Sequence, residues 1–273
     1  KVGVDEEFRL DPKLLKQAIE SDLKVGNKPV CVVATLGTTG VTAIDPLQDI
    51  AAICSRHGIW LHVDAAFAGS ALILPEFRWM IKGVEHADSF VFNPHKWLFT
   101  NFDCSAYFVR DKYSLIRTLQ VTPEYLRTQD QGKVNDYCDW GVPLGRRFRA
   151  LKLWFVIRSY GVDALKEKLR YHISLAKELA ERIDHEDGFE LMAPVTLNLV
   201  CFRYRPKGID DEKELNRINA MLLKKINKTG RAYLSHTTLN GKYIIRMVIG
   251  QTEVERKHVE EAWRLIRVLS SEC

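Results

Sequence analysis

The sequence lacks the features that mark several large classes of protein. Its longest apolar stretches, residues 30–36 and 153–157, fall far short of the ~20 residues that a membrane-spanning helix needs. Neither sign of charge dominates, because 40 basic residues stand against 35 acidic ones in a chain of 273. The densest basic cluster, at residues 146–149, is too small for a nucleic-acid-binding surface. We therefore expect neither a membrane nor a nucleic acid among its partners.

Metal-binding and secretory features are also missing. The six cysteines are spread along the chain with no CxxC or CxxxC pair, so a zinc site is not expected. No secretory signal is visible, and a reducing cytoplasm is therefore the expected location. The first residue is Lys1 rather than Met, and the residues after it read like the tail of a strand and a loop. We expect the chain to be the C-terminal part of a longer protein.

The chain does contain 46% hydrophobic and 27% charged residues, a balance that is typical of a globular protein with a sizeable core. In the first half, helix signals alternate with short apolar runs that are typical of buried strands. The predicted strands lie at residues 29–36, 59–63, 88–92 and 105–109. This alternation predicts an α/β fold with a mainly parallel sheet, in which ligands bind beyond the carboxyl ends of the strands.

The second half changes character twice. Residues 122–136 are polar without a sustained apolar period, and loops of this length in compact domains are often lids. Helical spacing then resumes, with a break at Gly161, and residues 189–273 carry strand and helix signals of an α+β type. We therefore predict the C-terminal part of a large domain over residues 1–161 and a small α+β domain over residues 162–273.

Polar residues follow three successive predicted strands. Asp64 ends the second strand, and Lys96 lies just beyond the third between apolar neighbours. Thr38 and Thr39 stand between glycines after the first strand. Each has an ordinary alternative: a carboxylate that caps a turn, a lysine that reaches water, and a plain turn. A lysine in apolar surroundings, however, loses its proton more readily and becomes a nucleophile towards carbonyl groups.

Taken together, a hydroxyl pair, a carboxylate and a lysine at neighbouring strand ends match the needs of pyridoxal 5′-phosphate. Lys96 can form a Schiff base with the aldehyde of this cofactor. Asp64 can keep the pyridine nitrogen protonated, so that the ring accepts electrons. A threonine hydroxyl can bond the phenolic oxygen of the ring.

Five blocks of sequence extend this interpretation: LGTTG (36–40), HVDAAFAGS (62–70), FNPHKW (92–97), NFDCSA (101–106) and PLGRRFRALKLWF (143–155). Together they closely resemble the group II pyridoxal-phosphate-dependent amino-acid decarboxylases, with the aromatic-L-amino-acid decarboxylases as the nearest branch. The resemblance covers essentially the whole chain, and the spacing between Asp64 and Lys96 is its most specific element. It implies the pyridoxal-phosphate transferase-like fold (fold type I) for the large domain, of which the chain would carry a part.

The resemblance also implies roles for individual residues. Lys96 is the Schiff-base lysine, and Asp64 pairs with the pyridinium nitrogen. The other residues expected around the cofactor are Ala66 against the ring, Thr39 on its oxygen side, and Asn93 and His95 near the phosphate. Gly145 approaches the phosphate from the neighbouring subunit, which implies a homodimer with active sites at its interface.

The polar stretch matches the mobile catalytic loop of the family, and Tyr125 falls at the position of its catalytic tyrosine. After carbon dioxide leaves, the α carbon of the substrate must be protonated. A phenol on a closing lid can donate this proton while water is excluded. Family members with phenylalanine here resemble aldehyde synthases, so Tyr125 favours simple decarboxylation. An aromatic residue that only packs is the alternative.

The predicted function is thus the pyridoxal-phosphate-dependent decarboxylation of an L-amino acid, first of all an aromatic one, to the amine and carbon dioxide. Two alternatives stay open. The substrate can be an acidic amino acid such as glutamate or cysteine sulfinate, because most of the family's discriminating pocket precedes the point where Lys1 begins. The chain can also be an inactive truncated fragment that acts only as an interaction module.

Overall fold

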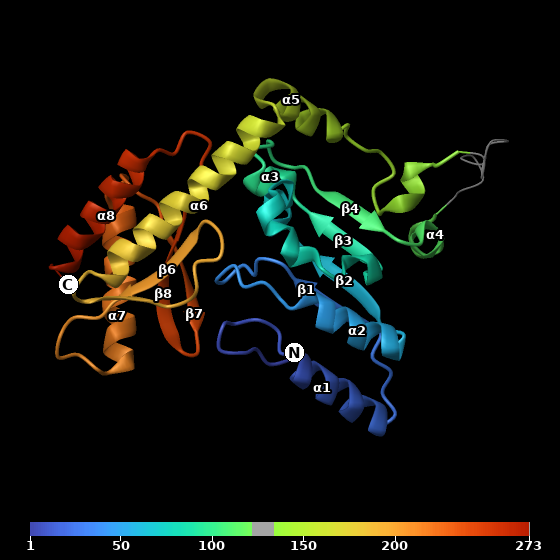
Figure 1. The fold of residues 1–273 in the computed structure, drawn as a ribbon, viewed down its shortest axis with the longest axis horizontal. Coiled ribbons are helices and arrows are strands. Elements are labelled where there is room, and N and C mark those ends of the chain that lie inside the picture. Colours follow the sequence, from blue (N-terminus) through green and yellow to red (C-terminus); the bar gives the residue numbers. More distant parts are fainter. Residues whose placement is uncertain (122–133, 273) are drawn as a thin grey trace.

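The computed structural model describes residues 1–121 and 134–272 (Figure 1). Its helices are α1 (Pro12–Lys24), α2 (Leu47–His57), α3 (Pro94–Trp97), α4 (Lys112–Leu119), α5 (Ala150–Tyr160), α6 (Val162–Asp184), α7 (Glu212–Lys228) and α8 (Arg256–Ser270). Its strands are β1 (Cys31–Thr35), β2 (Trp60–Asp64), β3 (Ser89–Phe92), β4 (Ala106–Val109), β5 (Phe189–Leu191), β6 (Leu199–Tyr204), β7 (Ser235–Leu239) and β8 (Lys242–Val248). Its 3₁₀ turns are η1 (Ala68–Ile73), η2 (Pro75–Ile81), η3 (Val84–His86) and η5 (Tyr137–Trp140). Within the two described ranges, every helix is too short or too polar to span a bilayer.

The first sheet is mainly parallel and has the strand order β1-β2-β3-β4. β1, β2 and β3 run parallel, with Thr35 opposite Asp64 and Asp64 opposite Val91, and β4 joins β3 in the antiparallel sense. The α/β class and the mainly parallel sheet predicted from the sequence are confirmed. The carboxyl ends of β1, β2 and β3 lie along one edge of the sheet, where ligands of such folds bind.

Local signals explain where the first helices begin and end. Asp11 caps α1 by accepting the backbone N–H of Lys13, and Pro12 fills a first-turn position where a missing N–H has no consequence. α2 ends at Gly58, whose φ of 61° is left-handed. The apolar side of α2, with Leu47, Ile50, Ala51 and Cys54, is buried.

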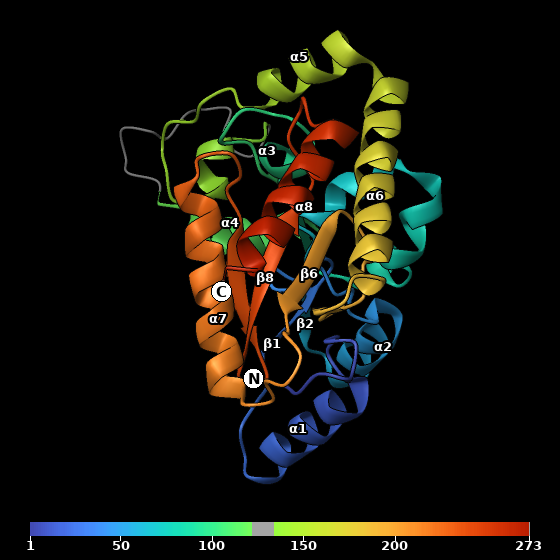
Figure 2. The ribbon, with the colours of Figure 1, turned by 90° about the vertical axis from the view of Figure 1, so that its left-hand side faces the viewer.

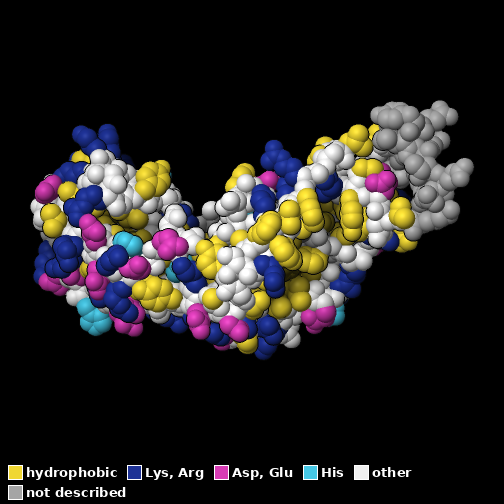
Figure 3. All heavy atoms as spheres, turned by 90° about the horizontal axis from the view of Figure 1, so that it is seen from above, with side chains coloured by type: hydrophobic (Ala, Val, Ile, Leu, Met, Phe, Trp, Pro, Cys, Tyr) yellow, Lys and Arg dark blue, Asp and Glu magenta, His cyan; other side chains and the backbone are white. Residues whose placement is uncertain are grey.

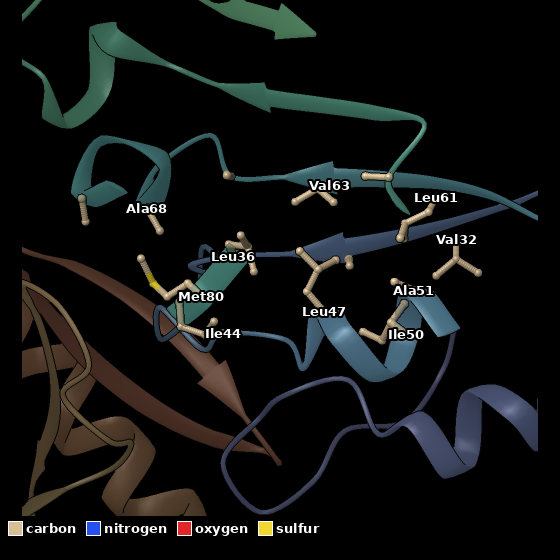
Figure 4. Close-up of a cluster of buried hydrophobic side chains, with 14 of the residues drawn as sticks. Val32, Leu36, Ile44, Leu47, Ile50, Ala51, Leu61, Val63, Ala68 and Met80 are labelled. Atoms are coloured by element: carbon tan, nitrogen blue, oxygen red, sulfur yellow. The ribbon is translucent and has the colours of Figure 1, made fainter. Parts of the chain in front are cut away.

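Helix α2 covers one face of the first sheet, and alternate strand residues point towards it (Figure 4). Val32 of β1 and Leu61 of β2 are at most 8% exposed and belong to one core cluster with Ile50 of α2. Strands with a buried side chain at every second position need a covering layer on that side only. The core under the candidate site therefore lies between this sheet and α2.

The opposite face of the first sheet, here called the open face, carries Val33, His62 and Tyr107. Val33 pairs with His62 across β1 and β2, and the rings of His62 and Tyr107 stack with centroids 6.2 Å apart. Val33 is 51% exposed and Tyr107 is 49% exposed. Parallel sheets are normally buried on both faces. The described residues, however, cover this sheet on one side only, and the open face stays partly exposed.

The second sheet is antiparallel, with the strand order β5-β6-β8-β7. Helices α6, α7 and α8 cover one of its faces (Figure 2), where Phe202 and Trp263 share a buried core. Its other face meets the loop after β1, since Leu199 and Cys201 cluster with Val41. This sheet is therefore covered on both faces.

Helix α6 connects the two sheets. It begins directly after Gly161, a residue with a φ of 78° that separates it from α5. Leu169, in its first half, belongs to the core of the first sheet, whereas Leu179 belongs to the core of the second. The predicted division between residues 1–161 and 162–273 thus falls at a helix break, and it stays a prediction because the helix after the break packs on both cores.

Candidate active site

The loops that follow β1, β2 and β3 are bonded to one another at one edge of the first sheet. The backbone N–H of Leu36 donates to the carbonyl of Asp64 over 2.8 Å, and the N–H of Asn93 donates to the carbonyl of Ala66 over 3.0 Å. The residues that this edge gathers are Thr39, Asp64, Ala66, Asn93, His95 and Lys96. Six of the eight residues predicted for the site therefore follow neighbouring strand ends.

Small residues allow these loops to pack closely. Gly37 has a φ of 82°, and a Cβ atom placed on it would lie 2.8 Å from the Cβ of Ala68. Gly69 is packed in a similar way against the side chain of Phe92. Ala68 is fully buried, whereas Ala66 is partly exposed. Ala66 is therefore the small residue of this group that a flat ligand can reach.

Asp64 is half-buried at the end of β2 and has one oxygen engaged by the protein. Its Oδ1 accepts the backbone N–H of Ala66 over 2.9 Å, which is the turn-capping role considered from the sequence. Within the described ranges, Oδ2 has no hydrogen-bond or ion-pair partner. The carboxylate is thus oriented by one bond and still able to accept another.

Lys96 lies on the single-turn helix α3, just beyond β3 as predicted, but its side chain is exposed. The expectation of apolar surroundings is wrong for the described residues. Trp97 and Leu98 are buried, at 1% and 5% exposure, yet successive helical residues point about 100° apart. Their burial therefore does not enclose Lys96. Its amine forms no ion pair with any described residue and stays available to a ligand.

The two threonines of the first loop have different environments. Thr38 Oγ1 accepts the backbone N–H of Ala43 over 3.0 Å, so this hydroxyl stabilises the turn itself. Thr39 is exposed, and its carbonyl accepts a hydrogen bond of 2.6 Å from Nη2 of Arg246. Of this pair, Thr39 presents the hydroxyl that can turn towards a ligand.

Asn93 and His95 flank the start of α3. The Oδ1 atom of Asn93 is buried and has no partner among the described residues. The Nδ1 atom of His95 lies 2.8 Å from the carbonyl oxygen and 3.0 Å from the backbone nitrogen of Cys104. His95 therefore holds the loop after α3, and Asn93 is the residue with unused bonding capacity.

Two predicted site residues are not part of this group. Gly145 lies in an exposed loop, where a Cβ atom would meet nothing within 4 Å. Its predicted role depends on a neighbouring subunit and stays a prediction. Tyr125 and most of the expected lid lie outside the described residues.

Three residues beside the site were not identified from the sequence: Phe67, Trp97 and Arg246. The rings of Phe67 and Trp97 stack with centroids 5.2 Å apart and planes within 3°. Arg246, from β8, also donates through Nε to the carbonyl of Gly40 over 2.8 Å. No local pattern reveals such partners, because Arg246 lies about 200 residues from the loop that it holds.

Pyridoxal phosphate fits this set of groups. An exposed amine suits its aldehyde, and a carboxylate with a free oxygen suits its pyridinium nitrogen. The unpartnered amide of Asn93 can present its NH₂ group to a phosphate oxygen after half a turn of the side chain. The residues that the sequence assigns to this cofactor therefore have the bonding capacity to hold it.

Comparison with known proteins identifies the same cofactor chemistry. Residues 1–205 match the model of the pyridoxal-dependent decarboxylase conserved domain. The chain is 47% identical over 262 residues to phenylacetaldehyde synthase from Arabidopsis thaliana, a match that covers 95% of the chain and 53% of that protein. It is 47% identical over 265 residues to tyrosine decarboxylase 3 from Petroselinum crispum, covering 95% of the chain and 51% of that protein. The crystal structure of Oryza sativa TDC with PLP and tryptamine matches with a TM-score of 0.95 at 41% identity, covering 99% of this chain and 56% of that one.

The chain spans about half the length of the curated relatives that it matches. The family match includes the whole first sheet and all eight predicted site residues. The likeness to the solved structure extends through the second sheet as well, since it covers 99% of the chain. The chain belongs to the pyridoxal-dependent decarboxylase family.

Proposed function

We propose that the protein containing this chain uses pyridoxal phosphate to decarboxylate an L-amino acid, releasing the amine and carbon dioxide. One observation carries the proposal: Asp64 ends β2, Lys96 lies just beyond the parallel neighbour β3, and each has a functional group that no described residue occupies. The activity is proposed for the whole protein, since the chain covers about half of its relatives.

Each residue of the site would have a defined task. When bound, pyridoxal phosphate supplies a ring that accepts the electron pair left by the departing carboxylate group. Lys96 would hold the cofactor through its amine. Asp64 would keep a proton on the pyridine nitrogen, because a negative charge beside a base favours its protonated form. The residues that would hold the rest of the cofactor are Ala66 at the ring, Thr39 at its oxygen side, and Asn93 and His95 at the phosphate.

Tyr125 would donate the proton that the α carbon of the substrate needs after decarboxylation. A phenol is a suitable acid for this step when water is excluded from the site. Formation of an aldehyde is a second candidate activity, because phenylacetaldehyde synthase is as similar to the chain as tyrosine decarboxylase 3, at 47% identity. The substitution Tyr125→Phe is expected to shift the product from amine to aldehyde. Unchanged amine output would remove Tyr125 from the mechanism.

A second copy of the protein is part of the proposal. Helix α5 follows the loop of Gly145 and has no buried residue among those described. Leu151, Trp154 and Phe155 of α5 are 39–57% exposed. Figure 3 views the molecule from above, the side on which α5 lies in Figure 1, and shows hydrophobic side chains gathered on that side. We propose that a homodimer buries this apolar surface and brings Gly145 to the cofactor phosphate of the partner subunit.

An aromatic substrate is proposed because the relatives named above are a tyrosine decarboxylase and a phenylacetaldehyde synthase, and the solved structure holds tryptamine. The deciding experiment supplies the intact protein and pyridoxal phosphate with tyrosine, phenylalanine, tryptophan, glutamate and cysteine sulfinate. Carbon dioxide, amine and aldehyde are measured for each. We expect turnover of the aromatic amino acids and none in the variant Lys96→Arg, which keeps the positive charge.

The alternatives give different results in the same experiment. Turnover of glutamate or cysteine sulfinate alone would assign the acidic substrate class. A protein that loads pyridoxal phosphate on Lys96 but releases carbon dioxide from none of the five amino acids would favour the interaction module.

The cytoplasm is the proposed location. The five cysteines that the structure describes are all free thiols, which suits a reducing compartment. Fractionation of cells that produce the intact protein tests this, and recovery in a secreted fraction would contradict it.

A further inference from the structure

His172 of α6 is completely buried and bonded to the residue that follows Lys96. The indole N–H of Trp97 donates to Nδ1 of His172 over 3.1 Å. His172 is 0% exposed and Trp97 is 1% exposed, so water cannot replace either partner. A bond of this kind fixes the rotation of the indole ring, and with it the end of α3.

A second contact joins His172 to the same segment. The ring of Phe99 lies 5.8 Å from the ring of His172, with the two planes 82° apart. Phe99 has a φ of 52°, a left-handed conformation that costs a residue with a side chain about 1–2 kcal/mol. Trp97 and Phe99 therefore hold this unusual backbone path against α6 from two positions.

A further contact of Trp97 reaches the loop after β2. Its ring stacks on Phe67, which lies three residues after Asp64. Trp97 thus stands between the loop of Asp64 and His172 of α6. Movement of the indole would displace the segment that carries Lys96 relative to the loop that carries Asp64.

His172 acts here as an uncharged acceptor. Burial, with a further contribution from the charge of Lys168, lowers the pKa of His172 to about 4. A neutral imidazole has one acceptor nitrogen, so the bond from Trp97 places the ring hydrogen on Nε2. The buried Nε2 has no partner among the described residues. The polar contribution of His172 is therefore the single acceptor that it presents to Trp97.

We propose that His172 is a positioning residue for Lys96: its acceptor nitrogen fixes Trp97, its ring packs against Phe99, and together these contacts set the direction in which the Lys96 side chain leaves α3. This inference rests on the proposed role of Lys96 as the amine that holds the cofactor. It assigns to α6, a helix of the second half of the chain, a part in the geometry of a site built on the first sheet.

The test compares His172→Leu with His172→Asn in the intact protein. Leucine has a similar volume and no acceptor, whereas the side-chain oxygen of asparagine can take the place of Nδ1. The first readout is the rate at which pyridoxal phosphate is captured on Lys96, trapped with borohydride and located by peptide mass spectrometry. The second readout is the separate effect on kcat and KM.

We expect His172→Leu to slow capture at Lys96 and to lower kcat by roughly 10- to 100-fold, because misplacement of a reacting group by about 1 Å has effects of this size. KM should change much less. In His172→Asn, the rate of capture at Lys96 and kcat should both stay close to those of the unmodified protein. Trp97→Phe removes the donor of the same bond and should reproduce the slow capture, including in a case where His172→Leu does not fold.

Asn219→Leu is the matched control. Asn219 is a fully buried polar residue of α7 that donates to the carbonyls of Tyr204 and Leu215 in the second half of the chain. It should lower thermal stability and leave capture at Lys96 unchanged in the folded protein. Normal capture in folded His172→Leu or Trp97→Phe would overturn the positioning role. Normal capture by the unmodified protein without any product would instead overturn the proposed function.

Discussion

The first sheet is covered by α2 on one face and leaves Val33 and Tyr107 about half exposed on the other, whereas the second sheet is packed on both sides. Particular polar groups of the two halves differ as well. In the second half, the buried Arg203 bonds both Glu190 and Glu212. In the first half, Asp64 and Lys96 are at least partly exposed and keep bonding capacity that no described residue uses.

The fully bonded groups stabilise the fold, and the groups with unused bonding capacity are available to bind a ligand. Buried polar groups that are fully bonded hold a fold together, but they have nothing left to offer a ligand. Groups with a free oxygen or amine are stable only where water or a ligand can reach them. The candidate site therefore lies on the less covered sheet, and the second sheet supplies a closed core beside it.

Among the variants that compare the two sheets, the largest effect on activity is expected at Asp64, where the catalytic and turn-capping roles can be separated. Asp64→Asn keeps an oxygen that accepts the N–H of Ala66 and removes the negative charge. We expect kcat of the intact protein to fall about 100- to 1000-fold, as for the loss of a major electrostatic contact. The free energy of unfolding should change little. Steady-state kinetics and urea unfolding of the same preparation measure both quantities.

If Asp64 has only a turn-capping role, the opposite result is expected for the kcat of Asp64→Asn. If Asp64 only caps its turn, asparagine replaces it without loss, and kcat stays near that of the unmodified protein. Asp64→Ala completes the comparison, because it removes charge and cap together and should lower both activity and stability.

The second sheet should show large effects on stability instead. Trp263 of α8 is 5% exposed, and its ring lies 4.9 Å from that of Phe189 and 6.2 Å from that of Phe202. Trp263→Ala should lower the free energy of unfolding by about 3–5 kcal/mol, since it leaves a cavity in a closed core. Urea unfolding measures this loss. A loss below about 1 kcal/mol would show that the second core is not closed in solution.

His172 connects the two halves and gives a smaller, pH-dependent effect. Its pKa of about 4 lies below the value of about 6.5 in an unfolded chain, so the unfolded state binds a proton more readily between these values. The free energy of unfolding should therefore fall by about 2 kcal/mol between pH 7 and pH 5 through this residue. Urea unfolding at both pH values measures it, and His172→Asn is the reference in which this part disappears. If the free energy of unfolding depends on pH equally in both proteins, the lowered pKa of His172 is contradicted.

Much of the first sheet could be predicted from the sequence because its signals are local. Apolar β-branched runs mark β1 and β2, and Asp11 with Pro12 marks the start of α1. The strand ends follow directly, and with them the places of Asp64 and Lys96. By contrast, β7 (Ser235–Leu239) is largely exposed and polar, so its sequence has no apolar alternation to reveal it.

The environment of Lys96 could not be predicted, because it depends on side-chain direction rather than on neighbours in sequence. The apolar residues Trp97 and Leu98 point into the core, away from the lysine. The bond from Trp97 to His172 joins residues 75 positions apart. Only the packing of α6 against α3 creates that contact, and no spacing rule predicts it.

The smallest effect is expected on the open face, and it tests the comparison most directly. Val33 is 51% exposed there, and Val33→Thr keeps its shape and β-branched character. If this face is open to solvent, Val33→Thr should change the free energy of unfolding by less than about 0.5 kcal/mol, as for other exposed positions. Ala34, its neighbour in β1, is 0% exposed and points towards α2, so Ala34→Thr should cost well over 1 kcal/mol by overpacking and by burying a hydroxyl. If Val33→Thr instead lowers the free energy of unfolding as much as Ala34→Thr does, the open face is covered in solution. The two sheets would then differ only in what covers them: residues of the same chain on the second sheet, and another part of the protein or a second copy on the open face of the first.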